Sequence, residues 1–427
     1  MRTGAIDELQ ELRRKIYLTA KSEKRKCFWG LFCHVTKIET LDKAYKLARE
    51  NNGSAGVDGV TFADIERYGT YNFIKEIREE LINGTYLPTR NRKVEIPKSN
   101  GKTRTLGIGT IKDRVVQGAL KLILEPIFEA DFSECSYGFR PKKNQHQAVN
   151  RVAKGIVRGF TKVIDVDLTA YFDNINHKIL MDKIALRVND SKIMRLIKLM
   201  LKINGKVGVP QGSVISPLFS NIYLNAIDRM FEKAKQGTSR KGYENMEYCR
   251  YADDTVILVN GHEAVDWLVS KSYRRLREEL AKLKINLNVE KTKIVDMSQG
   301  ETFGFLGFDF RLVKSKGKKM VLLKPKKKKV TELISKVKTH LVQSRNKTVT
   351  EMIEELNPIL RGWVNYYRIG HCSRTLTYIK IWVERKVRRF ARKAQKKFGF
   401  GWKEWSSEII YGKWGLFSDY QVRYFSS

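Results

Sequence analysis

Apolar residues recur at helical spacing along the first fifty residues of the chain, for example at Leu9, Leu12 and Ile16. A repeat of three or four positions places such side chains on one face of a helix, so residues 1–50 are predicted to be helical. The same repeat predicts further helices over residues 71–83, 112–129 and 176–203, and one that starts near Ile215.

Shorter stretches of alternating apolar and polar residues predict strands. Residues 92–108 contain two such stretches around a Ser-Asn-Gly-Lys turn at 99–102, which predicts a hairpin. Residues 161–173 predict a strand that runs into a helix, and residues 248–259 predict two strands joined by a tight Asp-Asp turn. Helices mixed with a small antiparallel sheet indicate an α+β fold.

The charge balance changes this picture, because the chain has 82 Lys and Arg against 46 Asp and Glu, a net charge of +36. Such a chain repels itself unless a polyanion neutralises it. It has no run of about 18 apolar residues that could span a bilayer, and its start lacks the apolar core of a signal peptide. We therefore expect a cytoplasmic protein whose partner is nucleic acid, with no membrane involved.

The positive charge is concentrated in the last part of the chain, where residues 311–427 contain 29 basic and 8 acidic residues. The densest run, 314–329, is interpreted at least in part as a solvated linker. Beyond it, apolar residues from Leu376 to Phe390 recur at helical spacing. They predict an amphipathic helix whose basic outer face can lie along a phosphate backbone.

The candidate chemistry centres on Asp253 and Asp254, which form the predicted turn. Adjacent carboxylates repel each other unless a cation lies between them, although the pair alone could be an ordinary surface turn. Asp167, at the end of a predicted buried strand, supplies a third carboxylate. Three carboxylates can hold two Mg²⁺ ions that activate a hydroxyl group and stabilise a leaving pyrophosphate. A metal contact by Asp165 stays open.

The order of these segments resembles the palm of reverse transcriptases. In that family the metal-binding aspartate stands five residues before an aromatic steric gate, and Asp167 and Phe172 fit this spacing whereas Asp165 does not. The resemblance implies a right-hand polymerase fold with fingers, palm and thumb. It also implies an RNA-directed DNA polymerase with Asp167, Asp253 and Asp254 as catalytic, Mg²⁺-binding residues, dNTPs as substrates and an RNA/DNA primer–template duplex as partner.

Further motifs follow in the order expected for the family, among them the 92–108 hairpin, Pro-Gln-Gly-Ser at 210–213, Asn-Val-Glu-Lys at 288–291 and Phe-Leu-Gly-Phe at 305–308. The resemblance implies that the dNTP is contacted by Lys98, Arg104, Phe172, Gln211 and Lys291. It implies that the nucleic acid is contacted by Arg140, Tyr251, Gly307, Arg361, Tyr367, Arg385, Arg388 and Arg389.

Two segments resemble the group II intron maturase family in particular: the glycine-rich loop 53–59 and the stretch 356–367. This resemblance implies that the protein binds structured RNA, either intron RNA or another template RNA, and promotes splicing and mobility. We therefore expect four parts, which are an N-terminal helical extension (1–50), fingers and palm (51–311), a helical thumb or maturase domain (312–400) and a short C-terminal DNA-binding-like tail (401–427).

The sequence departs from the family at Gly109, where proline is usual, and at Ser213, where glycine is usual. No nuclease module follows residues 411–417, so we expect the endonuclease-lacking bacterial type. An intron of this type finds its DNA primer elsewhere, for example at a replication fork, so we expect the protein at the nucleoid when it is on DNA.

Two alternative functions are considered. The protein could be a freestanding relative recruited for phage defence or repair, which the DNA around its gene would reveal. It could instead be an RNA chaperone that no longer polymerises, but the presence of all three aspartates argues against this alternative. The sequence does not identify protein partners.

Overall fold

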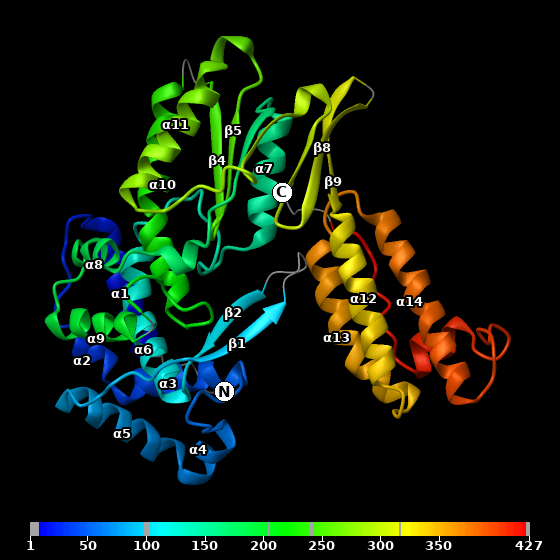
Figure 1. Ribbon diagram of the computed structural model, residues 1–427, viewed down its shortest axis with the longest axis horizontal. Helices are drawn as coiled ribbons and strands as arrows, with labels where there is room; N and C mark the ends of the chain where they lie inside the picture. The colour runs from blue at the N-terminus through cyan, green and yellow to red at the C-terminus, as the bar shows by residue number, and fades with distance from the viewer. Residues whose placement is uncertain (1–7, 98–102, 204, 240–242, 316, 424–427) are drawn as a thin grey trace, which may run out of the picture.

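The computed structural model describes residues 8–97, 103–203, 205–239, 243–315 and 317–423. Its first body is helical and carries a two-stranded hairpin (Figure 1). The elements of this body are α1 (Glu8–Ser22), α2 (Leu31–Val35), α3 (Ile38–Glu50), α4 (Phe62–Tyr68), α5 (Thr70–Asn83), β1 (Arg92–Pro97), β2 (Thr103–Ile108) and α6 (Ile111–Glu129).

The α6 helix forms the centre of this body, because its buried residues pack against α1, α2 and α3. Its first turn is capped by Thr110, whose side chain accepts a hydrogen bond from the Asp113 amide at 3.1 Å. The predicted hairpin is confirmed, with Arg92 paired to Ile108 in an antiparallel register. The predicted helical stretch over residues 1–50 is divided into three helices.

The second body is built on a four-stranded antiparallel sheet with the order β4-β5-β3-β6. The strands are β3 (Lys162–Val166), β4 (Met246–Tyr251), β5 (Asp254–Val259) and β6 (Lys293–Asp296). The helices are α7 (Gln145–Val157), α8 (His177–Ala185), α9 (Ser191–Lys202), α10 (Ser216–Thr238) and α11 (Trp267–Lys282), with short turns η1 (Tyr171–Asn174), η2 (Glu263–Val265) and η3 (Met297–Gln299).

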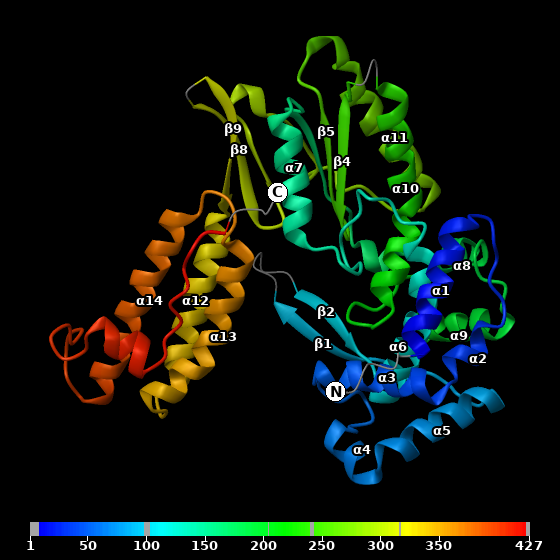
Figure 2. The same cartoon turned by 180° about the vertical axis from the view of Figure 1, so that it is seen from behind.

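Both faces of this sheet are covered. Because successive side chains of a strand point to opposite faces, Val163 packs with α7 while Ile164 belongs to the core that includes α10. Figures 1 and 2 show α10 and α11 on one side of the sheet and α7 on the other. Burial on both faces explains the nearly continuous apolar run of β5.

The third body combines a three-stranded sheet with a helical lobe, which runs from yellow through orange to red in Figure 1. Its elements are β7 (Thr302–Phe305), β8 (Phe308–Ser315), β9 (Lys318–Pro325), α12 (Lys327–Gln343), α13 (Val349–Tyr367), α14 (Ser373–Ala394) and the π-helical turn η4 (Ile409–Lys413). The predicted amphipathic helix is confirmed as α14, which buries Leu376, Ile379 and Val383. The α+β architecture with a helical C-terminal lobe is as expected.

Two predicted elements are wrong. The expected helix over 176–203 is broken between α8 and α9, because the segment at Val188 forms a bridge with Phe28, and Asp190 then caps α9. The expected linker over 314–329 is instead the end of a β-hairpin followed by the start of α12. In β9, Val321 and Leu323 face the core, and the flanking lysines had hidden this alternation.

Candidate active site

Asp167 directly follows β3, the strand that lies between β5 and β6. Its carbonyl oxygen accepts a hydrogen bond from the Asn288 amide at 2.9 Å, and its own amide donates to Thr292 Oγ1 at 3.3 Å. Lys291 lies in the same segment, with its Nζ atom 3.6 Å from Asp167 Oδ2. The segment that precedes β6 therefore fixes the backbone of Asp167 and places a cation beside its carboxylate.

The turn between β4 and β5 carries the other two candidate carboxylates. Tyr251 pairs with Asp254 across the turn, with Ala252 and Asp253 between them. Ala252 has a φ of 57°, a left-handed conformation that is uncommon for a residue with a side chain. The tight turn with its two aspartates is therefore as expected, and its backbone is strained at Ala252.

The pairing of β3 with β5 brings Asp167 to this turn. Val166 pairs with Thr255 in the antiparallel ladder. One further step in the same register sets Asp167 opposite Asp254, next to the tip that carries Asp253. Residues separated by more than eighty positions thus meet at one end of the central sheet.

The charges of these carboxylates influence one another. Loss of solvent and then the neighbouring negative charges, with Asp253 first, raise the pKa of Asp254 to about 7. Loss of solvent and the charge of Asp167 raise the pKa of Asp165 to about 6, against the opposing charge of Lys326. Loss of solvent also raises the pKa of Asp253. A site that crowds carboxylates in this way favours a bound cation.

In the part of the chain that the structure describes, no group of three or more His, Cys, Asp or Glu side chains is arranged so that it could hold a metal ion by itself. Asp167, Asp253 and Asp254 lie close enough for their charges to influence one another. An open group of oxygen ligands suits Mg²⁺, which is usually held by one or two carboxylates together with substrate phosphates and water. The residues present therefore fit a magnesium ion that is completed by its substrate.

A buried ion pair holds the β4–β5 turn against α10. Arg250 and Asp228 are 1% and 0% exposed in their side chains, with Arg250 Nη2 2.5 Å from Asp228 Oδ2. Arg250 Nη1 also donates to the Ala252 carbonyl oxygen at 2.8 Å, inside the turn. Tyr248 donates its hydroxyl to the same aspartate at 2.8 Å. The guanidinium thus connects the strained turn to α10.

The sequence interpretation missed this pair, although one signal was available. Arg250 is a charged residue at a buried position of a strand, and such a residue requires a buried partner. The loop at Gly138 completes the support. A Cβ atom on Gly138 would lie 2.3 Å from the Ala252 nitrogen, so only glycine fits there. Its carbonyl accepts a hydrogen bond from Asn221 Nδ2 at 2.8 Å.

Two of the predicted dNTP contacts meet between the hairpin and the 210–214 turn. The Arg104 side chain donates to Gln211 Oε1, and the Gly107 amide donates to the Gln211 carbonyl oxygen at 2.8 Å. Phe172 is buried in η1, and its carbonyl oxygen accepts a hydrogen bond from the Val209 amide at 2.8 Å, at the start of the same turn. Lys98 lies outside the described residues.

Comparison with protein families agrees with this geometry. A model of the reverse transcriptase (RNA-dependent DNA polymerase) family matches residues 96–310, which is half of the chain. The chain belongs to the reverse transcriptase family. A model of the group II intron maturase-specific domain matches residues 330–406. This reverse transcriptase is therefore an RNA-directed DNA polymerase with a maturase domain of the group II intron type.

Similar proteins point the same way. This reverse transcriptase is 35% identical to protein YkfC of Escherichia coli over 73% of its own chain and 90% of that protein. It is 29% identical to the group II intron-encoded protein LtrA of Lactococcus lactis, over 84% of its own chain and 73% of that protein. It is 27% identical to an uncharacterised 91 kDa protein in the cob intron of Schizosaccharomyces pombe, over 86% of its own chain and 51% of that protein.

The prediction that Arg140 contacts nucleic acid is wrong, because the side chain is only 3% exposed. Its guanidinium forms an ion pair with Glu129 at 2.7 Å and donates to the carbonyl oxygens of Ser133 and Ser136. The Arg140 guanidinium therefore makes its contacts within the reverse transcriptase itself. These contacts hold the end of α6 against the loop before α7.

The same correction applies to Arg388, which the α14 pattern assigned to the basic outer face. Its side chain is 2% exposed and pairs with Glu384 at 2.8 Å. It donates to the carbonyl oxygen of Trp405 and lies over the Trp402 ring at 4.2 Å. Arg388 therefore packs the segment that follows α14 onto the helix, and it has no free surface for RNA.

Tyr367 is buried as well, so the expected contact of its side chain with nucleic acid is also wrong. Its ring lies 4.5 Å from Trp363, and a Cβ atom on Gly307 would lie 2.5 Å from its hydroxyl oxygen. Gly307, which has a φ of 80°, thus packs against Tyr367 where the β7–β8 turn contacts the thumb. Tyr251 is half-buried, with its ring 6.4 Å from that of Phe139.

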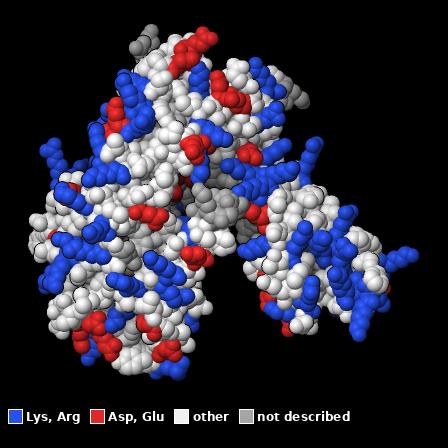
Figure 3. Space-filling view, viewed as in Figure 1, with Lys and Arg blue, Asp and Glu red and all other residues white. Residues whose placement is uncertain are grey.

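The other predicted arginines have free surfaces. Arg361, Arg385 and Arg389 are exposed, and among the described residues none of them has an ion-pair partner. Lys and Arg side chains gather over the α12–α14 lobe in Figure 3. Within the described residues, no helix has the length and apolar character needed to cross a bilayer.

A basic groove at the junction of β8–β9 with α12 and α14 was not predicted. It has a volume of about 550 Å³ and is lined by, among others, Arg311, Lys324, Lys327, Arg374 and Tyr378. None of its four cations has an acidic partner in the described part of the chain. The high charge of this region had been assigned to a linker, and only the folded hairpin places these side chains around one groove.

Proposed function

We propose that this reverse transcriptase copies RNA into cDNA at Asp167, Asp253 and Asp254, which hold two Mg²⁺ ions when primer–template and dNTP are bound. The β3–β5 register is the observation that carries this proposal, because it sets Asp167 opposite Asp254. The bound ions lower the pKa of the primer 3′-hydroxyl and stabilise the charge on the leaving pyrophosphate.

The reaction is a nucleotidyl transfer. The primer 3′-hydroxyl loses its proton to solvent, and its oxygen forms a bond with the α-phosphorus of the dNTP. The bond from that phosphorus to the bridging oxygen breaks, and pyrophosphate leaves with the electron pair. Lys291, whose Nζ is 3.6 Å from Asp167, neutralises the pyrophosphate. Arg104 and Lys98 hold the triphosphate, and Gln211 forms the floor of the pocket. Phe172 excludes nucleotides that carry a 2′-hydroxyl.

We propose that the thumb binds structured RNA, in the first place the intron RNA that encodes this chain, and promotes its splicing and mobility. Support comes from the exposed arginines 361, 385 and 389 and from the basic groove, whose cations have no acidic partner among the described residues. Tyr378, which is 52% exposed, offers a ring on which an unpaired base can stack.

The division of the chain follows from these roles. We assign residues 1–50 to an N-terminal extension, 51–311 to fingers and palm, 312–400 to the thumb and 401–427 to a short DNA-binding-like tail. The border at 311 falls inside β8, so the sheet β7–β9 belongs to palm and thumb together. We place the protein in a bacterial cytoplasm, at the nucleoid when it acts on DNA.

Primer extension tests the catalytic proposal. On poly(rA)/oligo(dT) with Mg²⁺ and dTTP, we expect the double variant Asp253→Ala/Asp254→Ala to incorporate at least about a thousandfold less than wild type, because metal ligands contribute several kcal/mol to the rate. A matched control removes two aspartates that form surface ion pairs away from the site, Asp42→Ala/Asp182→Ala. Equal incorporation by wild type and the catalytic double variant would show that the proposal is wrong.

A further inference from the structure

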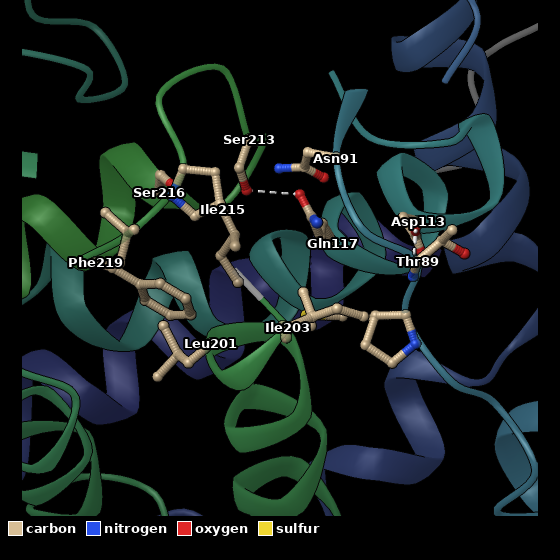
Figure 4. A pocket seen from close by; sticks show the side chains of 14 residues that line it. Thr89, Asn91, Asp113, Gln117, Leu201, Ile203, Ser213, Ile215, Ser216 and Phe219 are labelled. Carbon is tan, nitrogen blue, oxygen red and sulfur yellow. Dashed lines mark hydrogen bonds between the residues drawn. The ribbon is translucent and has the colours of Figure 1, made fainter. Parts of the chain in front are cut away.

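The turn at residues 210–214 is held from behind by α6, as Figure 4 shows. Gln117 Oε1 accepts one hydrogen bond from Ser213 Oγ at 2.7 Å and a second from the Val214 amide at 3.1 Å. A carbonyl oxygen of this kind has two lone pairs, and both are used here. The contact connects two segments that lie about a hundred positions apart in the sequence.

The same turn is held on its other side by β2. The Gly107 amide donates to the Gln211 carbonyl oxygen at 2.8 Å, and the Arg104 side chain donates to the Gln211 amide oxygen. The turn that carries Gln211 therefore lies between the hairpin and α6. A change in its distance from α6 would alter the position of a side chain that the proposed function assigns to the dNTP.

A small cavity of about 20 Å³ lies beside this contact between the turn and α6, with Asn91, Asp113 and Ser216 among its lining residues. Ligand sites usually need about 300 Å³ or more, so no nucleotide fits here. The wall that faces the turn is rigid, because Asp113 accepts hydrogen bonds from the Tyr86 hydroxyl at 2.6 Å and the Thr89 amide at 3.1 Å. The cavity is therefore packing space behind the substrate site.

We propose that Gln117 and Ser213 are positioning residues that fix the position of Gln211 in the dNTP site. This inference rests on the proposed polymerase function. The Ser213 hydroxyl, at a position where the resemblance expects glycine, supplies a bond that glycine cannot make. It fixes the turn to the helix at the residue that follows Gly212, whose φ is 103°. Loss of this bond lets the turn move without removing any group that touches the substrate.

The test measures dTTP incorporation by the full chain on poly(rA)/oligo(dT) with Mg²⁺. For Ser213→Ala we expect KM for dTTP to rise about three- to tenfold, the effect of one neutral hydrogen bond, with kcat changed by less than about twofold. Ser213→Thr keeps the hydroxyl and should keep the wild-type KM. Gln117→Leu removes both bonds, so adding Ser213→Ala to it should change KM no further.

Ser216→Ala is the matched control, because Ser216 lines the same cavity and its hydroxyl has no hydrogen-bond partner among the described residues. It should keep the wild-type KM. If wild type extends the primer but Ser213→Ala keeps its KM, or loses only thermal stability, the inference is overturned. If wild type does not extend the primer at all, the proposed function itself fails, and the two failures are thus distinguished.

Discussion

Arginines in the palm and in the thumb lobe have opposite surroundings. Beneath the catalytic turn, Arg250 is 1% exposed and its charge is matched by Asp228. On the thumb, Arg361, Arg385 and Arg389 are exposed, and the described residues offer them no acidic partner. The first kind of arginine can position backbone but cannot bind RNA, whereas the second kind can bind phosphate. Residue type and local charge therefore do not identify a nucleic-acid contact until burial and partners are known.

The largest expected effect comes from breaking the buried pair. Asp228→Asn leaves the Arg250 charge buried without its partner, so we expect the free energy of unfolding to fall by roughly 3–5 kcal/mol. Urea denaturation of the full chain measures this change. The double variant Arg250→Met/Asp228→Leu removes both charges and should recover part of the loss. A fall of less than about 1 kcal/mol for Asp228→Asn would contradict the supporting role of the pair.

A smaller effect is expected from the thumb. In the triple variant Arg361→Gln/Arg385→Gln/Arg389→Gln, we expect RNA affinity to fall about tenfold and the slope of log affinity against log salt to become shallower by about 2, because three phosphate contacts are lost. Stability should change by less than about 0.5 kcal/mol per site, since these side chains are exposed. Filter binding at several salt concentrations measures both affinity and slope.

The matched control for the thumb removes three exposed cations that have acidic partners, as Lys46→Gln/Arg67→Gln/Lys178→Gln. It changes the net charge by the same amount. If the control and the thumb variant reduce the salt slope equally, net charge alone explains the effect. The claim that unpaired cations bind RNA and paired cations do not would then be wrong.

The sequence predicted those features of the fold and site that depend on spacing. The strand before Asp167, the turn with Asp253 and the amphipathic pattern of α14 are all periodic or local signals. Its errors concern interactions between distant segments. The break between α8 and α9 depends on a bridge between Phe28 and Val188, which no local pattern reveals.

Three of the predicted contacts with nucleic acid, those of Arg140, Arg388 and the Tyr367 side chain, were wrong for the same reason. Arg388 fits the basic pattern of its helix, but Glu384 and the chain beyond α14 bury it. Arg140 is paired with Glu129, which lies at the end of a different element. The bond between Gln117 and Ser213 was invisible because it joins α6 to a loop far along the chain. Side-chain partners across such distances require the folded structure.

The most direct test of the account concerns Asp167, because the β3–β5 register is what assigns it to the same site as Asp253 and Asp254. Asp167→Asn keeps the shape of the side chain and removes its charge. In single-turnover incorporation of dTTP with Mg²⁺, we expect a rate about a thousandfold below wild type, with primer–template affinity changed by less than about threefold. A rate above about one tenth of wild type would contradict the account.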